Sequence, residues 1–475
     1  SNPSGTARFP RFRDFGRHLR ALECTPSGVF SDRWRRFHAD RKHVASPSHV
    51  SPDELQVAPV PGDPSVARRR VLDFVLIGVL LVLTALPDAM VVPILEELMV
   101  ERYGVDPGPA HAFISINLLG GLCALPLLRT TMRIGRPVLA VAIAAIADGL
   151  LLAAMWLPIG FWPTIALRGL EGVADVVVFA VVFDLVGQSG RARAAGLRFG
   201  IGAALLSIAL GGGAILGGQI AGADDGSGDA ARAVYLIGAS ACFLAGVVAF
   251  LGRHRLRRVD SKASTPATPS VTATDQPRAP LWPLLLMASA DRAAGGLLTG
   301  TLGLFLAEAI GLDPSIRGRL IGSVLLLMGL GAIPAGWVSD RFGDLRIRAI
   351  GGVAFAAGLF LLPLAADDLS SLIQTMLLLG IGGATLLPTS LALLDRLHGG
   401  LFGMGGFRAA GDFGFLVGVS MAGLLLYLLG SGRSSYSEYV AVICGFAIMH
   451  LCTTFVAVPA LARRDRAMKR KQQDP

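Results

Sequence analysis

Three charged residues stand close together in a stretch of the sequence that is otherwise apolar. Arg168, Glu171 and Asp175 are spaced i, i+3 and i+7, so in an α-helix they lie on one face. One arginine beside two acids can keep one carboxylate ionised and leave the other to bind and release a proton. The spacing predicts a proton-transfer site, and the alternative is an ion pair that only fixes helix packing.

Two further acids interrupt apolar stretches. Asp88 directly follows Pro87, and Pro93 lies a little further along. Such prolines free backbone carbonyls where a helix lines a cavity. Asp148 has no oppositely charged residue near it in the sequence. We predict that five residues carry proton coupling: Asp88, Asp148, Arg168, Glu171 and Asp175.

Other charged residues in apolar stretches have a simpler interpretation. Arg408 and Asp412 are spaced i, i+4 and can pair on one helix, either as a gate or as a helix staple. Asp291 and Arg292 are adjacent, so they point about 100° apart, and we place them near an entrance without a transport role. His450 stands alone and is interpreted as a core or lipid-edge residue.

The composition indicates a membrane protein. Hydrophobic residues make up 53% of the 475, charged residues only 16%, and the mean hydropathy is +0.59. A soluble domain carries about 25% charged residues. The net charge of +9 lies in the tails and in alternate short segments between apolar stretches, which is typical of membrane topology and not of a nucleic-acid surface.

Five cysteines have no spacing typical of a zinc site, a redox motif or a disulfide framework. They are Cys24, Cys123, Cys242, Cys444 and Cys452. Four of them lie in apolar stretches, where a thiol behaves as a small hydrophobic group. We expect no metal, no disulfide and no cofactor.

A bilayer core about 30 Å thick requires roughly 20 apolar residues of helix. The sequence contains twelve such stretches: 71–98, 109–130, 137–158, 162–186, 194–221, 232–252, 281–310, 317–339, 347–366, 370–394, 402–430 and 438–462. The predicted fold is therefore all-α and integral to the membrane, with two six-helix halves at 71–252 and 281–463.

Three segments lie outside these halves. Residues 1–70 form a basic tail that we expect to be disordered, 253–280 read as a cytoplasmic linker, and 464–475 form a basic C-terminal tail. Arginines and lysines gather on one side of the predicted spans, which makes that side cytoplasmic and puts both termini inside. Arg102, Arg317 and Arg319 are exceptions on the acidic side.

The two halves repeat one another. Gly104-Val-Asp-Pro107 after the first span matches Gly311-Leu-Asp-Pro314 after the seventh, at an offset of 207 residues. Parallel halves of this kind place a cavity on their pseudo-two-fold axis near mid-membrane. At the same offset Asp88 matches Gly295, and other first-half charges also match small or apolar residues. We infer that proton coupling resides mainly in the first half.

Several motifs resemble the major facilitator superfamily. Gly336-Trp-Val-Ser-Asp340-Arg341-Phe-Gly343 is similar to the family's signature loop, and the first-half loop keeps Arg133, Gly135 and Arg136 but has Met132 in place of the acid. Arg168-Gly-Leu-Glu171-Gly172 is similar to the family's Arg-x-x-Gln-Gly motif. Gly213-Ala-Ile-Leu-Gly217-Gly218 resembles its antiporter motif without the proline, and the region around Arg408 resembles drug-efflux-like members.

The resemblance implies a twelve-helix transporter close to the drug:proton antiporter branch. It also implies a set of gating residues that stabilise one conformation: Asp184, Asp340, Arg341, Gly343, Arg133, Gly135, Asp395, Arg408 and Asp412. The glycines of the antiporter-like motif, Gly213, Gly217 and Gly218, are expected to pack helices closely.

The leading functional prediction is proton-coupled efflux of a small amphipathic compound by alternating access. Uptake of a metabolite by symport or facilitation is one alternative, and a non-transporting sensor or scaffold on the same fold is another. The sequence has no Walker A motif and no arrangement of catalytic nucleophiles, so neither ATP-driven transport nor an enzyme is expected. The expected partners are a small-molecule substrate, protons and the lipid bilayer of the plasma membrane, with no nucleic acid; a monomer is expected.

Overall fold

The computed structural model describes residues 64–124, 137–188, 195–223, 229–263, 281–398, 401–430 and 435–473, and every regular element in these ranges is a helix. The first half contains α3 (Pro64–Met90), η3 (Val92–Ile94), η4 (Glu96–Glu101), α4 (Pro107–Ala110), α5 (Ala112–Cys123), α7 (Pro137–Met155), α8 (Phe161–Gln188), α9 (Ala195–Gly222) and α10 (Asp229–Ala263). The second half contains α11 (Trp282–Leu297), η6 (Leu298–Leu302), η7 (Phe305–Ala309), α12 (Pro314–Phe342), α13 (Asp344–Leu364), α14 (Leu369–His398), α15 (Leu401–Leu429) and α16 (Tyr436–Gln473).

Nine helices among the described residues are long and apolar enough to cross a membrane, judged by length and composition. The structure also has helix in the three remaining predicted spans, 109–130, 162–186 and 281–310, but these helices are shorter or carry charged residues. α5 has 12 described residues, α11 has 16 before it gives way to π-helix, and α8 carries Arg168, Glu171 and Asp175 within its apolar sequence. Twelve spans therefore stay a prediction.

Helices extend beyond the predicted half boundaries. α3 begins at Pro64, α10 continues to Ala263 into the expected linker, and α16 continues to Gln473 through most of the expected C-terminal tail. In each case the helix of an apolar stretch continues into a neighbouring charged segment. Arg and Lys have high helix propensity, so such an extension is physically reasonable.

The internal repeat has a structural counterpart in two turns. Gly104 and Gly311 both adopt left-handed backbone, with φ of 63° and 75°. Their N–H groups donate to the carbonyls of Val100 and Ala307, each at 2.9 Å. In both halves a π-helical segment precedes the turn, and Asp followed by Pro begins the next helix. Only glycine adopts this conformation without a steric penalty, which explains why both copies have it.

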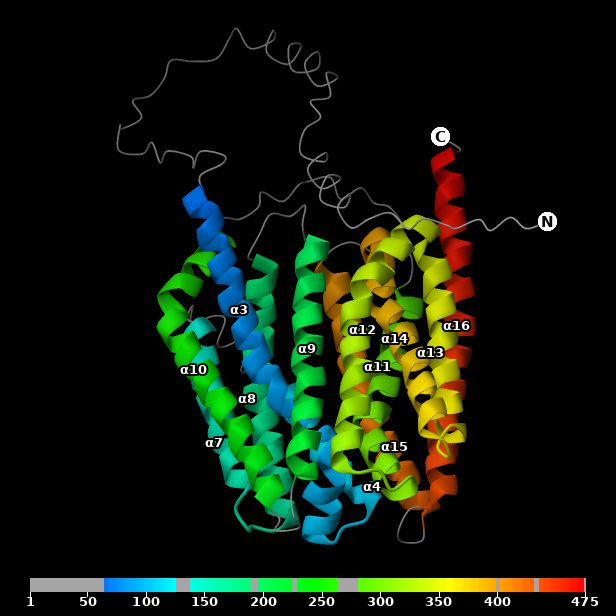
Figure 1. The fold of residues 1–475 in the computed structure, drawn as a ribbon. Coiled ribbons are helices and arrows are strands. Elements are labelled where there is room, and N and C mark those ends of the chain that lie inside the picture. The colour runs from blue at the N-terminus through cyan, green and yellow to red at the C-terminus, as the bar shows by residue number, and fades with distance from the viewer. Residues whose placement is uncertain are drawn as a thin grey trace, which may run out of the picture. The chain divides into compact units, whose positions relative to one another are not determined.

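The long helices run side by side along one direction, with α3, α7, α8 and α10 on one side of the bundle, α9 in the middle and α11 to α16 on the other (Figure 1). Helices of one half pack mainly on each other, and the most extensive contact between halves joins α9 to α12. Glycines permit that approach. A Cβ on Gly218 would overlap the backbone of Pro314 and Gly318, and one on Gly322 would overlap Gly211.

The same helix α9 also packs on α3 through glycine. A Cβ on Gly213 would overlap the carbonyl oxygen of Leu86, and one on Gly217 would overlap that of Met90. Thus Gly213 and Gly217 contact the first half, while Gly218 contacts the second. The motif lets α9 lie between α3 and α12 at close range.

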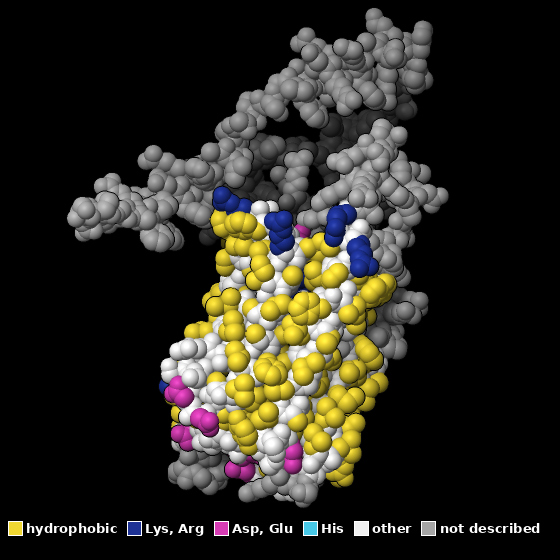
Figure 2. All heavy atoms as spheres, turned by 90° about the vertical axis from the view of Figure 1, so that its right-hand side faces the viewer, with side chains coloured by type: hydrophobic (Ala, Val, Ile, Leu, Met, Phe, Trp, Pro, Cys, Tyr) yellow, Lys and Arg dark blue, Asp and Glu magenta, His cyan; other side chains and the backbone are white. Residues whose placement is uncertain are grey.

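The outer surface has the charge distribution of a membrane protein. Figure 2 shows hydrophobic side chains over the middle of one face, with Lys and Arg gathered toward one end and Asp and Glu toward the other. Large apolar side chains on this part of the chain are exposed, among them Ile350 at 66%, Phe455 at 63% and Leu428 at 66%. An apolar belt of this kind is stable in contact with lipid. Which end is cytoplasmic stays a prediction.

Candidate functional site

The side chain of Arg168 on α8 is the centre of a buried polar cluster in the first half. It is 3% exposed. Nη1 donates to Oε1 of Glu171 at 2.5 Å, and Nη2 donates to Oδ1 of Asp88 at 3.4 Å. The guanidinium carbon also lies 5.0 Å from the centre of the Phe113 ring, within the range of a cation–π contact. One arginine therefore joins acids from α3 and α8.

Asn117 on α5 completes the contacts of Glu171. Its Nδ2 donates to Oε2 of Glu171 at 2.5 Å, so both oxygens of this carboxyl group are held. Glycines allow α5 to come so close to α8. A Cβ on Gly172 would overlap the carbonyl oxygen of Asn117, and one on Gly120 would overlap that of Gly169. Gly120 and Gly172 thus allow α5 to place Asn117 beside Glu171.

Asp148 on α7 is the second buried acid of this cluster. It is 3% exposed, and the thiol of Cys242 on α10 donates to its Oδ2 at 3.0 Å. Its other oxygen, Oδ1, has no donor among the described residues. Asp148 is also close enough to Glu171 and Asp88 for the charges of these groups to interact.

Asp175 lies one turn after Glu171 on α8 and is 9% exposed. It is close enough to Asp88, Asp148 and Glu171 for their charges to interact. The structure therefore brings together all five residues for which the sequence predicts a proton-transfer role. Sequence reasoning missed Asn117 and Cys242, because an amide or a thiol in an apolar stretch gives no signal by itself.

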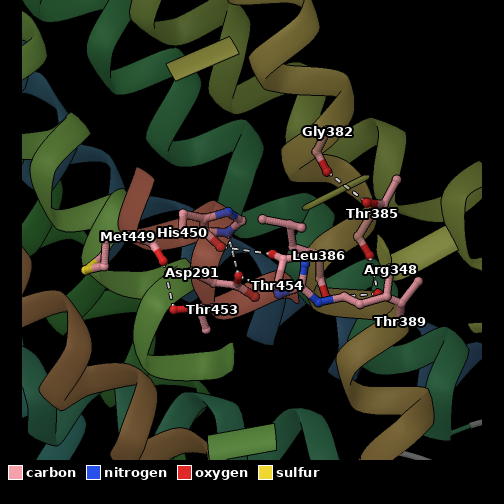
Figure 3. Close-up of polar contacts among 10 residues, drawn as sticks. All are labelled: Asp291, Arg348, Gly382, Thr385, Leu386, Thr389, Met449, His450, Thr453 and Thr454. Atoms are coloured by element: carbon pink, nitrogen blue, oxygen red, sulfur yellow. Dashed lines mark hydrogen bonds and ion pairs between the residues drawn. The ribbon is translucent and has the colours of Figure 1, made fainter. Parts of the chain in front are cut away.

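A second buried cluster lies in the second half. The carboxylate of Asp291 on α11 accepts from Nη2 of Arg348 on α13 at 2.6 Å. It also lies 2.9 Å from Nε2 of His450 on α16. Figure 3 shows these side chains meeting from separate helices. Arg348 and His450 are each 1% exposed. His450 is thus buried but not isolated, and Asp291 binds two partners on other helices, whereas the sequence suggested an entrance residue.

Polar atoms around Asp291 are not all satisfied. Nε and Nη1 of Arg348 and Nδ1 of His450 have no hydrogen-bond partner among the described residues. The ring of Phe355 packs 5.0 Å from that of His450, centre to centre. Arg348 lies within α13, one turn from the helix start, and its side chain is buried.

Polar side-chain contacts join the two halves toward the acidic end of the molecule. Arg317 on α12 is 2% exposed and forms ion pairs with Glu97 and, at 3.3 Å, with Glu96 of η4. Nε2 of His111 lies 2.9 Å from Oγ1 of Thr301. Arg317 was an unexplained exception on the acidic side of the sequence. Its pairing with two acids of the other half accounts for it.

Arg102 is another basic residue at this end with a structural role. Its guanidinium donates to the carbonyl oxygens of Met155, Trp156 and Leu157, at 3.1, 2.8 and 3.1 Å. These carbonyls lie at the C-terminal end of α7, where backbone acceptors lack helical partners. Two of the three exceptions to the charge pattern, Arg102 and Arg317, are therefore explained by contacts with other segments of the chain. The third, Arg319, is exposed and donates to the carbonyl oxygen of Ser315 on its own helix.

The predicted gating residues have varied positions. Gly343 makes the turn between α12 and α13 with φ of 95°, and Asp340 and Arg341 just before it are exposed. Arg408 pairs with Asp412 at 3.6 Å on the exposed side of α15. Arg133 and Gly135 lie outside the described residues. Asp184 and Asp395 lie in α8 and α14, but their side chains are outside the described part.

Asp368, in the turn before α14, holds the start of that helix. Its carboxylate accepts from the backbone N–H of Ser371 at 2.9 Å and from the Ser371 hydroxyl at 2.8 Å. These bonds lower the pKa of Asp368 below its ordinary value. This acid stabilises helix α14 and is not part of either buried cluster.

Comparison with known proteins agrees with this architecture. Residues 281–475 match the family model of the Major Facilitator Superfamily. One curated relative is the 3-(3-hydroxy-phenyl)propionate transporter of Escherichia coli (strain K12), 36% identical over 118 residues. That match spans 25% of this chain and 28% of the relative.

Solved transporter structures share the fold over most of the chain. A bacterial homologue of the human lysosomal transporter Spinster, in an inward-facing and unoccupied conformation, matches with a TM-score of 0.66 and 12% identity, covering 83% of this chain and 98% of the other. The xylose transporter XylE from E. coli matches with a TM-score of 0.58 and 15% identity, covering 83% and 98%. These findings are consistent with a multi-pass protein of the plasma membrane that has the fold of the Major Facilitator Superfamily transporters.

Proposed function

We propose that this protein carries a small solute across the membrane by alternating access and couples its movement to protons at Asp88, Asp148, Arg168, Glu171 and Asp175. The observation that supports this most directly is the sharing of Arg168 between Glu171 and Asp88. A single cation binds two acids from different helices, and further acids lie beside it. Changes in the proton content of the cluster therefore change how α3 and α8 are held together.

Charge balance favours protons as the coupling ion. Four carboxyl groups and one guanidinium lie in one buried region, and unpaired buried charges are costly. Protons on some of the acids reduce that cost without any rearrangement of the chain. The cluster thus has the chemistry of a site that binds and releases protons as its access to water changes.

Access differs between the two acids bound to Arg168. The side chain of Asp88 is 24% exposed, whereas that of Glu171 is 2% exposed. The distance from Arg168 to Asp88 is also the longer of the two, 3.4 Å against 2.5 Å. Asp88 is therefore the acid that meets water or solute first, and Glu171 is the one that Arg168 holds more firmly.

The contacts between the halves support alternation. Ion pairs and hydrogen bonds close the acidic end, and glycines let α9 and α12 approach each other closely. We propose that the two halves tilt on each other at this close interface. Opening of the acidic end would require the bonds of Arg317 and His111 to break.

Uptake is the direction that the relatives favour. The curated relative is named as a transporter of 3-(3-hydroxyphenyl)propionate, an aromatic carboxylate, and two structural neighbours are named as a xylose transporter and a peptide transporter. We therefore propose import of a small apolar carboxylate together with protons. Efflux by a member of the drug:proton antiporter branch is the opposite outcome of the same experiment.

The test uses purified protein in liposomes with an imposed pH gradient. Radiolabelled 3-(3-hydroxyphenyl)propionate is measured in two modes: accumulation driven by the gradient, and exchange without a gradient. If Glu171 couples protons, Glu171→Gln abolishes accumulation but retains exchange, because exchange requires no net proton movement. Asp88→Asn should behave in the same way.

Asp73→Asn is the matched control, since it removes an acid from the same helix as Asp88. Asp73 pairs with Arg255 at 2.5 Å near the other end of α3, away from the buried cluster. Accumulation by this variant should equal that of wild type. Proton coupling at the cluster is refuted if Glu171→Gln accumulates the solute normally, and a wild-type protein inactive in both modes toward carboxylates and amphipathic cations favours the sensor or scaffold.

A further inference from the structure

Arg292 on α11 has an environment that the proposed proton site does not explain. Its side chain is exposed, yet protein surrounds it at longer range, so it borders an internal space. The guanidinium carbon lies 4.7 Å from the centre of the Phe415 ring on α15. Among the described residues no carboxylate forms an ion pair with it. Arg292 is thus an exposed cation that lies beside an aromatic ring and has no carboxylate in contact among the described residues.

The space beside Arg292 is open on one side. Gly295 lies one turn further along the same face of α11, and a Cβ there would meet only the Phe415 ring, at 3.8 Å. In the internal repeat Gly295 corresponds to Asp88. The second half therefore has a glycine, Gly295, where the first half has the partly exposed Asp88. Arg292 and Phe415 lie beside this glycine.

The acids near Arg292 are bound by other groups. Asp291, Asp412 and Arg408 are close enough to Arg292 for their charges to interact with its own. Asp291 binds Arg348 and His450, and Asp412 pairs with Arg408 at 3.6 Å, so neither carboxylate forms an ion pair with Arg292. An arginine in a membrane protein without its own acid is costly unless water or an anion meets its donors. Its planar fork matches a carboxylate with two parallel hydrogen bonds.

We propose that Arg292 and Phe415 form the binding site for the anionic end of the transported solute. The guanidinium binds the carboxylate, and the Phe415 ring packs against the apolar part that follows it. The substrate class is then small monocarboxylates with an aromatic or aliphatic body. This assignment rests on the proposed transport function and adds to it the residues that select the substrate. Arg292 binds the anion in the second half, while the first-half acids bind the proton.

Equilibrium binding to the purified full chain in detergent tests this site without any gradient. The probe is radiolabelled 3-(3-hydroxyphenyl)propionate, displaced by 3-phenylpropionate, by its neutral amide, and by hexanoate. Wild type should bind 3-phenylpropionate at least about tenfold more tightly than the amide, as expected for a charge-assisted hydrogen-bonded pair. Arg292→Gln should remove that preference and leave binding of the amide unchanged, and Arg292→Lys should retain part of it.

Phe415→Leu should weaken binding of 3-phenylpropionate several-fold more than binding of hexanoate. Arg253→Gln is the matched control, because Arg253 also lies over a phenylalanine ring, Phe250, at 3.9 Å, but is half-buried in the last third of α10, on another helix. Its preference for the acid should equal that of wild type.

Two results would overturn the assignment: a wild type that does not prefer the acid to the amide, including one that binds no carboxylate probe, or an Arg292→Gln variant that folds and keeps the preference. Failure of proton coupling is a separate result, seen as normal gradient-driven accumulation by Glu171→Gln. A binding preference that depends on Arg292 together with normal accumulation by Glu171→Gln would support the anion site and reject the coupling role of the acids.

Discussion

Nδ2 of Asn117 donates to Oε2 of Glu171 at 2.5 Å, so an uncharged amide on α5 holds the acid that Arg168 holds from the other side. The pair joins two helices at the most buried carboxyl group of the site. If Glu171 must release and regain a proton during transport, the amide stabilises its ionised form by hydrogen bonding.

Replacing Asn117 with leucine should therefore impair coupling more than folding. The variant lacks the donor to Glu171 but has a side chain of similar size. We expect gradient-driven accumulation to fall about tenfold, the effect of losing one hydrogen bond to a charged group, with exchange largely retained. Liposome accumulation and exchange measure the two rates. Equal losses in both would indicate that Asn117 acts only in packing.

The approach of α5 to α8 can be tested at Gly172. A Cβ at this position would overlap the carbonyl oxygen of Asn117, and neither backbone can move away without disturbing the other contacts of α8. Gly172→Ala should destabilise the protein by about 1–3 kcal/mol through overpacking. Thermal unfolding in detergent measures this. Gly212→Ala is the control, since a Cβ at Gly212 would meet no atom within 4 Å, and its unfolding midpoint should stay within a degree or so of wild type.

Much of the first-half site follows from helix geometry alone. The spacing of Arg168, Glu171 and Asp175 puts them on one face of any helix, and an acid beside Pro87 in an apolar stretch indicates a cavity. These are local relationships. In the structure Arg168 contacts both Glu171 and Asp88, and Asp175 lies one turn further along α8. That Asp148 joins the same cluster could not be derived, since its partners lie on α8 and α10 and depend on which helices are neighbours.

The cluster around Asp291 shows more clearly which contacts cannot be predicted from the sequence. Asp291, Arg348 and His450 lie on three helices and are separated by many residues in the sequence, so no periodic pattern relates them. Arg348 also follows other basic residues at the start of a span, where the charge pattern favours a loop interpretation. The repeat indicated that proton coupling resides mainly in the first half, which stays a prediction. The second half has a buried cluster of its own, at positions that have no charged counterpart in the first half's site.

Arg317 should control opening at the acidic end. It is buried against Glu96 and Glu97 of the other half, so its removal leaves two acids without a cation and favours separation of the halves. Ser115 and Ser420 report on this, because their hydroxyl oxygens meet across the halves at 3.2 Å. In a background without native cysteines, the Ser115→Cys and Ser420→Cys pair should form a disulfide readily, and Arg317→Ala should lower the yield several-fold.

Arg319→Ala is the control for this experiment. Arg319 lies two positions away on α12, is exposed, and donates to the carbonyl of Ser315 on its own helix. Its removal should leave the disulfide yield at the level of the unmodified pair. If both arginine variants lower the yield equally, general loosening of α12 and not the ion pairs of Arg317 would be the cause.

The Asp291 cluster should respond to charge imbalance more than to loss of contacts. Asp291→Asn leaves the guanidinium of Arg348 buried without its carboxylate, and the expected loss of stability is about 3–5 kcal/mol. Adding Arg348→Gln removes the stranded charge, so the double variant should be more stable than Asp291→Asn alone. His450→Ala removes one hydrogen bond to Asp291 and should cost about 1–3 kcal/mol.

Thermal unfolding in detergent of wild type, Asp291→Asn, Arg348→Gln, the double variant and His450→Ala orders these effects, with Asp412→Asn as a control for an exposed pair. The pair of Asp412 with Arg408 is exposed on both sides, so its loss should change stability by about 0–1 kcal/mol. The stability losses of Asp291→Asn and Arg348→Gln can also simply add in the double variant. That result would mean that Arg348 stabilises the protein by its packing and that another group compensates its charge. Recovery in the double variant would instead establish that Asp291 is retained to neutralise an arginine buried between α11, α13 and α16.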